Sequence, residues 1–577
     1  MNNNLPSNVV FDIEANGFNP DTVWCLVAKG LDDDRVYTFG PECIDKGIAL
    51  LKQADTLIGH NLIGYDIPVL EKLYHVKFTN KIVDTLVLSR LFNPVQEGGH
   101  SLETWGQKLG IPKQDQPDFE TYSTAMMEYC TQDVRLNAAV YKALVASGRG
   151  FSMESIELEH AVANILKAQE QHGFLFDEQS ASMLVATLKE KMFEAEQEVH
   201  KVFKPKLIRD KLVVPKLKKD GSLSKVGLTD QEYDDCMSRP FWRKKLQQFN
   251  LGSRKQIGEY LIDFGWQPKK FTPTGQPIVD ENILSQITDI PQAKLIADYL
   301  LYQKRIAQVE SWLEALQPDG RVHGRVIPNG TITGRMTHRS PNMAQVPNMG
   351  SLYGKECRAC WIVPEDYKLL GVDASGLELR MLAHYMKDED YKNEILHGDI
   401  HTANQNMAGL DTRDQAKTFI YAFVYGAGDA KIGQIVGGNK ASGKQLKDRF
   451  LSNLPALKSL RERVNKAASR GFLKGIDGRK IYVRSEHAAL NTLLQGGGAI
   501  VMKKALVLLN EKFKLLNIDA KFVGNIHDEW QIEVKHCQAM KAGHLAVSAI
   551  REAGEYFKMF CPLDGEYKVG ENWSETH

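Results

Sequence analysis

Over residues 1–150, short apolar runs alternate with stretches of helical periodicity, a pattern that predicts an α/β domain. The first run, Val9 to Glu14, is apolar except for two acids, Asp12 and Glu14, at positions i and i+2. Residues two apart in a strand point to the same side, so both carboxylates share one face. The run predicts a buried strand with an acidic face, because a solvent-exposed edge strand would carry fewer apolar residues.

Two later segments of this region bring further polar side chains. Asp66 precedes Pro68 at the start of a helical pattern, so we expect Asp66 to cap that helix. Tyr129 and Asp133 stand four residues apart in a predicted helix over 126–144 and share one helix face.

The middle of the chain predicts long amphipathic helices over about 152–200 and 253–316. Between them, residues 201–225 hold nine lysines or arginines against two acids. This segment is either a solvated loop or an insertion that faces DNA or a partner protein.

After about residue 325 the pattern mixes strands, loops and a helical block over about 376–470. Asp373 ends an apolar strand that begins near Lys368. Asp528 stands between two strand-like runs, 522–523 and 532–534, which predict a hairpin with the acid at its turn. Two carboxylates held on rigid strands are suitable ligands for Mg²⁺.

Arg413, Lys417 and Tyr421 lie at i, i+4 and i+8 of a predicted helix between these two acids. Such spacing places two cations and an aromatic ring on one face. Cations facing a two-metal site suit a triphosphate, so the combination predicts nucleotidyl transfer.

Composition narrows the class of protein. The 577 residues predict several domains or subdomains, and 43% hydrophobic with 25% charged residues is ordinary for a globular chain. The formal net charge is zero, so any nucleic-acid contact must come from local patches. We expect a cytoplasmic protein (host cell cytoplasm if viral), since the N-terminus lacks the basic segment followed by an apolar one that marks a signal peptide. We expect no membrane association, because Lys503 and Lys504 interrupt the longest apolar run.

Two apparent metal motifs are weak. Cys357 and Cys360 form a lone CxxC without the second pair that a structural zinc site needs. His397 and His401 are four apart, but Gly398 weakens the helix and no third ligand is evident.

The segments around Asp373, Arg413 to Tyr421, and His527-Asp528-Glu529 resemble, in this order, motifs A, B and C of family A DNA polymerases. The resemblance is greatest to the replicative enzymes of short-tailed bacteriophages and covers nearly the whole chain. It implies an RNase H-like exonuclease domain followed by a right-hand polymerase, a multidomain α/β and α+β fold. The implied domains are an exonuclease over 1–150, a thumb over 151–325 with a basic insertion over about 201–250, a palm over 326–400 and 480–577, and fingers over 401–479.

The resemblance also implies roles at the polymerase site. Metal binding falls to Asp373, Asp528 and the Ala374 carbonyl, with Glu529 close by. The implied nucleotide-binding residues are His401, Arg413, Lys417, Tyr421 and Glu378, of which Glu378 closes the pocket against a ribose 2′-hydroxyl. The implied DNA-binding residues are Arg335, Tyr425, Asn491, Gln495 and His527.

Asp12, Glu14, Asp66, Asp133 and Tyr129 resemble the four acids and the tyrosine of DEDD-type 3′→5′ exonucleases. The implied cofactors are two Mg²⁺ ions at each site, for which Mn²⁺ is an expected substitute. The implied partners are primer-template DNA and dNTPs, together with a replicative helicase-primase and a single-strand binding protein. The segment over about 204–245 is shorter than the insertion by which some phage relatives recruit host thioredoxin, so thioredoxin dependence is not expected.

Three alternatives remain. Gly438 to Lys444 has the GxxxxGK frame of a P-loop, but Gln445 replaces the expected Ser or Thr and a helix pattern precedes it. A DEDD exonuclease with a noncatalytic DNA-binding C-terminal module would not need Asp373, Lys417 and Asp528 together. A nonenzymatic scaffold would leave both acid clusters unused.

Overall fold

The computed structural model describes residues 6–235 and 237–577, which divide into two compact units. Unit 1 comprises residues up to Phe176 and from Ala315 onward, and unit 2 is Asp177–Glu314. Each unit is described separately below.

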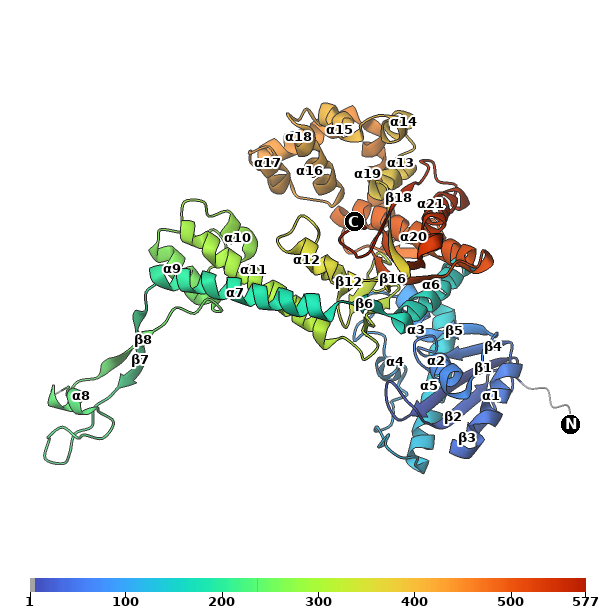
Figure 1. Cartoon of the computed structure of the whole chain (residues 1–577), viewed down its shortest axis with the longest axis horizontal. Helices are drawn as coiled ribbons and strands as arrows, with labels where there is room; N and C mark the ends of the chain where they lie inside the picture. The colour runs from blue at the N-terminus through green and yellow to red at the C-terminus, as the bar shows by residue number, and fades with distance from the viewer. Residues whose placement is uncertain (1–5, 236) are drawn as a thin grey trace. The chain divides into compact units, whose positions relative to one another are not determined.

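The N-terminal part of unit 1 is an α/β domain, drawn in blue in Figure 1. Its sheet has the order β3-β2-β1-β4-β5, in which β1 is antiparallel to β2 and parallel to β4. The central strands are fully apolar on one or both faces, so β1 is buried as its sequence predicted. The elements are β1 (Asn8–Ala15), β2 (Val23–Gly30), β3 (Val36–Phe39), η1 (Pro41–Cys43), α1 (Ile44–Gln53), β4 (Thr56–Gly59), α2 (Asp66–Tyr74), β5 (Lys81–Asp84), α3 (Thr85–Phe92), α4 (Leu102–Leu109) and α5 (Thr124–Ser147).

The C-terminal part of unit 1 is built on an antiparallel sheet of order β16-β17-β13-β18. The helix α21 lies against β13 and β18, and α20 lies against α21 and α6. The elements around this sheet are α6 (Met153–His172), β6 (Phe174–Phe176), β9 (Arg321–Val322), β10 (Arg325–Ile327), β11 (Thr337–Arg339), η2 (Met343–Gln345), α12 (Gly354–Ala359), β12 (Trp361–Ile362), β13 (Tyr367–Ala374), η3 (Glu486–Ala488), α20 (Ala489–Leu515), β16 (Ala520–Ile526), β17 (Glu529–Lys535), η4 (His536–Gln538), α21 (Ala539–Tyr556) and β18 (Gly565–Gly570).

A helical block joins β13 to the hairpin β14–β15, as the periodicity over 376–470 predicted, and it shares one hydrophobic core with the sheet. Its elements are α13 (Leu377–Met386), α14 (Glu389–His397), α15 (Ile400–Ala408), α16 (Arg413–Val424), α17 (Asp429–Ile435), α18 (Lys440–Asn453), α19 (Pro455–Ala468), β14 (Phe472–Lys474) and β15 (Lys480–Tyr482).

The segment Glu486–Leu515 passes a length and composition test for a membrane-crossing helix, with 72% of its apolar window buried inside the fold. That degree of burial is typical of a core helix, because a membrane-spanning helix turns its apolar surface to lipid.

Unit 2 is formed by two long helices, α7 and α11, that pack along each other. Its elements are α7 (Glu178–Val202), β7 (Lys206–Val213), α8 (Asp230–Asp234), β8 (Phe241–Gln247), α9 (Arg254–Asp263), α10 (Glu281–Ser285) and α11 (Pro291–Glu314). The basic segment that could have been a loop contains β7, which pairs antiparallel with β8. Leu207 and Leu246 lie opposite each other on this hairpin and are 68% and 61% exposed. The apolar residues of this strand therefore face solvent, and the sequence pattern did not predict the strand.

Candidate active sites

The two acids singled out by the sequence lie where the inner strands β13 and β17 of the antiparallel sheet meet the β16–β17 turn. Asp373 is the penultimate residue of β13 and stands in register with Glu529 at the start of β17. The Ala374 N–H donates a hydrogen bond of 3.3 Å to the Asp528 carbonyl oxygen, which ties the end of β13 to the β16–β17 turn. Burial, followed by the charges of Asp528 and Glu529, raises the pKa of Asp373 to about 7. Carboxylates that repel one another at a strand edge are a suitable ligand set for divalent cations.

Glu529 faces the C-terminal segment. Its carboxylate accepts hydrogen bonds from Trp573 Nε1 at 2.7 Å and Gln531 Nε2 at 2.6 Å, and it pairs with His577 Nδ1 at 3.0 Å. Burial opposes ionisation, but these partners hold the pKa of Glu529 below its usual value. Glu529 therefore anchors the start of β17 directly after Asp528, which lies in the β16–β17 turn, and His577 is a neighbour of this site that the sequence pattern did not identify.

The helix α16 presents the predicted cationic face. Thr412 and Gln415 form a reciprocal capping box that starts the helix at Arg413. Lys417 is exposed, whereas Arg413 pairs through Nε with Asp399 Oδ2 at 2.6 Å. Asp399 also caps α15, so Arg413 is tied to the neighbouring helix start instead of standing free for a triphosphate.

His401 and Tyr421 lie beside each other on these two helices, with ring centroids 6.3 Å apart. His401 Nδ1 is buried and has no hydrogen-bond partner among the residues that the structure describes. Burial, followed by the charge of Arg413, lowers the pKa of His401. His401 Nδ1, near the Lys417 charge, is therefore available to form a hydrogen bond with a bound ligand.

Glu378, Tyr425 and Arg335 meet at one carboxylate. Tyr425 donates its hydroxyl to Glu378 Oε1 at 2.7 Å, and Arg335 Nη2 lies 3.4 Å from the same oxygen. Burial and this hydrogen bond raise the pKa of Tyr425. The structure thus brings together residues from α13, the end of α16 and the β10–β11 loop.

The remaining predicted DNA-binding residues lie on α20 and at the β16–β17 turn. Asn491 and Gln495 are half-buried and one helical turn apart. His527 occupies the turn with φ +58° and is exposed. A cavity beside Asp528 is lined by His527, Arg335 and Lys503, among others.

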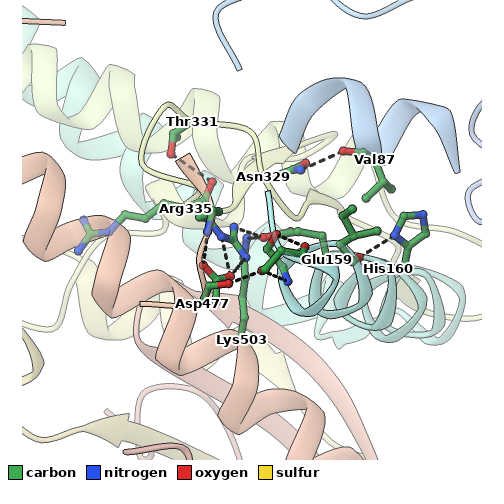
Figure 2. Close-up of polar contacts among 12 residues, drawn as sticks. Val87, Glu159, His160, Asn329, Thr331, Arg335, Asp477 and Lys503 are labelled. Atoms are coloured by element: carbon green, nitrogen blue, oxygen red, sulfur yellow. Dashed lines mark hydrogen bonds and ion pairs between the residues drawn. The ribbon is translucent and has the colours of Figure 1, made fainter. Parts of the chain in front are cut away.

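Behind this cavity lies a buried charge network that sequence reasoning missed. Glu159 Oε1 on α6 accepts from Lys503 Nζ at 2.6 Å and from the Arg479 guanidinium, which also binds Asp477 (Figure 2). A Cβ added to Gly334, at φ +75°, would lie 3.5 Å from Arg479 Nη1. The network therefore supports the loop that carries Arg335, and no local motif reveals it because its members come from three distant elements.

The N-terminal domain gathers a second acidic cluster around β1. Oxygen atoms of Asp12 and Glu14 and the sulfur of Cys130 all lie within 4.8 Å of one another. Burial, followed by neighbouring acids, raises the pKa of Asp12 to about 7 and that of Glu14 to about 10.

The prediction that Asp66 caps α2 is wrong: Asp66 is the first residue of the helix, and its Oδ1 accepts from the Ile13 N–H at 3.1 Å. That bond places Asp66 beside Asp12 instead of at the helix cap.

Asp133 and Tyr129 complete this cluster from one face of α5, together with a lysine that the sequence did not reveal. Lys113 Nζ lies 2.5 Å from Asp133 Oδ2 and 4.7 Å from the centroid of the Tyr129 ring. Cys130, three residues before Asp133 on the same helix, donates its thiol to the Asp12 carbonyl oxygen at 3.5 Å, which holds α5 against β1. The five predicted exonuclease residues therefore lie together, with Lys113 offsetting part of their charge.

The histidine pair and the P-loop frame that the sequence offered do not form sites of these kinds. His397 ends α14 and His401 is in α15, so they do not share a helix face. The GxxxxGK frame, Gly438 to Lys444, follows α17 and runs into the first turn of α18, whose N-cap is Asn439, so a helix stands where a P-loop requires a preceding strand.

Comparisons with known proteins bear on the whole chain. The family model described as DNA polymerase family A matches residues 230–575. The DNA-directed DNA polymerase of Enterobacteria phage T3 is 34% identical, and the match covers 99% of this chain and 100% of the relative. That of Escherichia phage T7 is 32% identical with the same coverage. A solved POL domain of Pol1 from M. smegmatis, in complex with DNA primer-template and dNTP, matches with a TM-score of 0.79 at 18% identity, over 98% of this chain and 95% of that one. The predicted fold class is thereby confirmed.

Proposed function

The chain belongs to DNA polymerase family A and is a DNA-directed DNA polymerase, and on that premise we propose how its two acidic clusters divide synthesis and proofreading. The observation that carries the proposal is the presence of two separate groups of mutually repelling carboxylates, one at the C-terminal end of β13 and one around β1. Each would hold Mg²⁺, whose charge offsets that repulsion.

At the polymerase site, we assign Asp373, Asp528 and the Ala374 carbonyl to the metal ions. Bound Mg²⁺ supplies charge stabilisation for the attacking and leaving oxygens of phosphoryl transfer. Lys417 and His401 would hold the triphosphate, joined by Arg413 once it releases Asp399. Tyr421 would contact the incoming sugar and base, and Glu378, fixed by Tyr425, would exclude a 2′-hydroxyl. The substrates are then dNTPs.

Primer-template DNA would lie over the surface that Arg335, His527, Asn491, Gln495 and Tyr425 share. Asn491 Oδ1 is buried without a hydrogen-bond partner in the described part of the chain, which supports a ligand-facing role. By analogy with the phage relatives, the reaction serves phage DNA replication in the host cytoplasm, where a helicase-primase and a single-strand binding protein are the expected partners.

Proofreading is assigned to the N-terminal cluster. Asp12, Glu14, Asp66 and Asp133 would bind two metal ions, and Tyr129 would orient the attacking water. The raised pKa values of Asp12 and Glu14 support this assignment, because closely spaced buried carboxylates repel one another and a bound cation relieves that repulsion.

A paired set of variants tests this assignment. Asp12→Ala/Glu14→Ala should release no nucleotides from a mismatched primer while extending a matched primer at the wild-type rate. Glu42→Ala/Asp45→Ala, which removes two exposed acids of the same domain, is the control and should retain both activities. Persistent nucleotide release by the first variant would contradict the assignment.

A further inference from the structure

Three arginines meet where the N-terminal domain contacts the β10–β11 hairpin. Arg325 and Arg339 lie directly opposite each other on these antiparallel strands, an arrangement of like charges that destabilises a sheet. Arg325 Nη2 donates to Asn61 Oδ1 at 3.4 Å, which places the hairpin against the loop between β4 and α2.

Arg90 on α3 lies near Arg325 and Arg339. Asn329, in the loop after β10, donates through Nδ2 to the Val87 carbonyl at 3.3 Å (Figure 2). Val87 and Arg90 are three residues apart on α3, so they share the helix face that meets the hairpin. Burial, followed by the charge of Arg325, lowers the pKa of the half-buried Arg90 to about 10, and Arg339 acts in the same direction. The three guanidiniums are therefore close enough to repel one another.

The nearby acid, Asp84, offsets only part of this charge, because its single carboxylate acts to raise the pKa of Arg90 but faces three guanidinium groups. Asp84 accepts backbone N–H bonds from Asn61 at 2.9 Å, from Ile63 at 3.1 Å and from Leu86 at 2.9 Å, so its oxygens are already engaged. Within residues 6–235 and 237–577, none of the three arginines forms a salt bridge. Arg90 and Arg325 are half-buried while Arg339 is exposed, so the cluster holds two cations that are costly to leave without a counter-charge and one that a ligand in solvent can reach.

The hairpin also spans the two active sites. The loop between its strands carries Arg335, which contacts Glu378 in the polymerase pocket. Its arms carry Arg325 and Arg339, of which Arg325 binds Asn61 in the loop that leads to Asp66 of the acidic cluster. An anion bound by the arginines would thus lie between the two sites.

We infer that Arg90, Arg325 and Arg339 bind the phosphodiester backbone of a single DNA strand whose 3′ end is leaving the polymerase pocket for the Asp12 cluster. The inference rests on the proposed proofreading function. Guanidinium groups match phosphate oxygens in paired hydrogen bonds, and backbone contacts carry no sequence preference. The arginines therefore bind any primer end that has separated from its template, whatever its sequence.

The test compares two substrates of the full chain. One is a single strand of about ten nucleotides, which can reach the arginines while its 3′ end is hydrolysed. The other is a dinucleotide, which has only the scissile phosphate and needs the acidic cluster alone. The variant is Arg90→Gln/Arg339→Gln, which leaves the Arg325–Asn61 contact in place. Arg35→Gln is the matched control, because it neutralises an exposed arginine before β3, at the opposite edge of the sheet from β5.

For the double variant, KM for the longer strand should rise several-fold and the salt dependence of kcat/KM should fall by about one unit of slope per arginine. Its kcat/KM for the dinucleotide should match wild type, and Arg90→Lys/Arg339→Lys should recover much of the loss. Thermal melting checks that each variant is folded. An unchanged KM and salt slope for the longer strand would overturn the inference. If wild type hydrolyses neither substrate, the proofreading proposal itself fails, and the inference fails with it.

Discussion

Tyr425 donates a hydrogen bond of 2.7 Å to Oε1 of Glu378, across 47 residues of sequence. The bond joins the end of α16, which carries the predicted triphosphate ligands, to the first turn of α13, which follows Asp373. It fixes the carboxylate that the proposal places against the 2′ position of the incoming sugar.

We therefore expect Glu378→Ala to raise ribonucleotide use relative to deoxyribonucleotide use by roughly 10- to 100-fold, the range in which one hydroxyl is discriminated by shape. Tyr425→Phe should change the ratio in the same direction by less, because the carboxylate remains but is no longer held. Single-turnover kcat/KM for an rNTP and its dNTP gives the ratio. Glu389→Ala removes an exposed acid as a control, and the idea fails if Glu378→Ala behaves as this control does.

The buried network around Glu159 predicts a large stability effect. Glu159→Ala would leave Lys503 and Arg479 buried without their shared carboxylate, a loss of about 3–5 kcal/mol in the free energy of unfolding. Glu157→Ala, on an exposed position of the same helix, should change it by no more than about 0.5 kcal/mol. Urea unfolding of both variants measures the difference, and equal values would show that the network contributes little.

His338 should make the free energy of unfolding depend on pH. Burial lowers the pKa of His338 to about 4, below the ordinary histidine value of 6.5, and both ring nitrogens are buried without hydrogen-bond partners in the described residues. The unfolded chain then binds more protons than the folded chain between these values, so stability falls as pH drops from about 6.5 to 4.

His338→Leu should make this loss shallower by up to about 1.4 kcal/mol per pH unit, the contribution of one proton. His536→Leu, which removes an exposed imidazole, should leave the slope as it is. Urea unfolding at several pH values between 4 and 7 gives both slopes. A wild-type slope in the His338 variant would show that this residue does not carry the effect.

The sequence predicted best where local pattern decides structure. The hairpin around Asp528, the strand that ends near Asp373 and the helix beginning at Arg413 depend on strand alternation and capping, which act over a few residues. The prediction that Asp66 caps α2 was wrong because an acid at a helix start can accept from local or from distant N–H groups, and here its Oδ1 accepts from the distant Ile13 N–H.

What the sequence did not show depends on long-range contacts. Arg413 finds Asp399 on a neighbouring helix, and Lys113 finds Asp133 across the N-terminal domain. Arg325 and Arg339 are paired only by hairpin register. Charges of this kind have no periodic signature, so only the folded chain reveals which of them are neutralised and which remain unpaired.

Primer extension by Asp528→Ala tests the central claim most directly. A labelled primer annealed to a longer template is incubated with Mg²⁺ and the four dNTPs, and extension is compared between wild type and the variant. Asp528 accounts for one of the two acids assigned to the metal ions, so extension should be lost while nucleotide release from a mismatched end continues at the Asp12 cluster. Extension at the wild-type rate would contradict the assignment of the polymerase site to the C-terminal end of β13 and the adjacent β16–β17 turn.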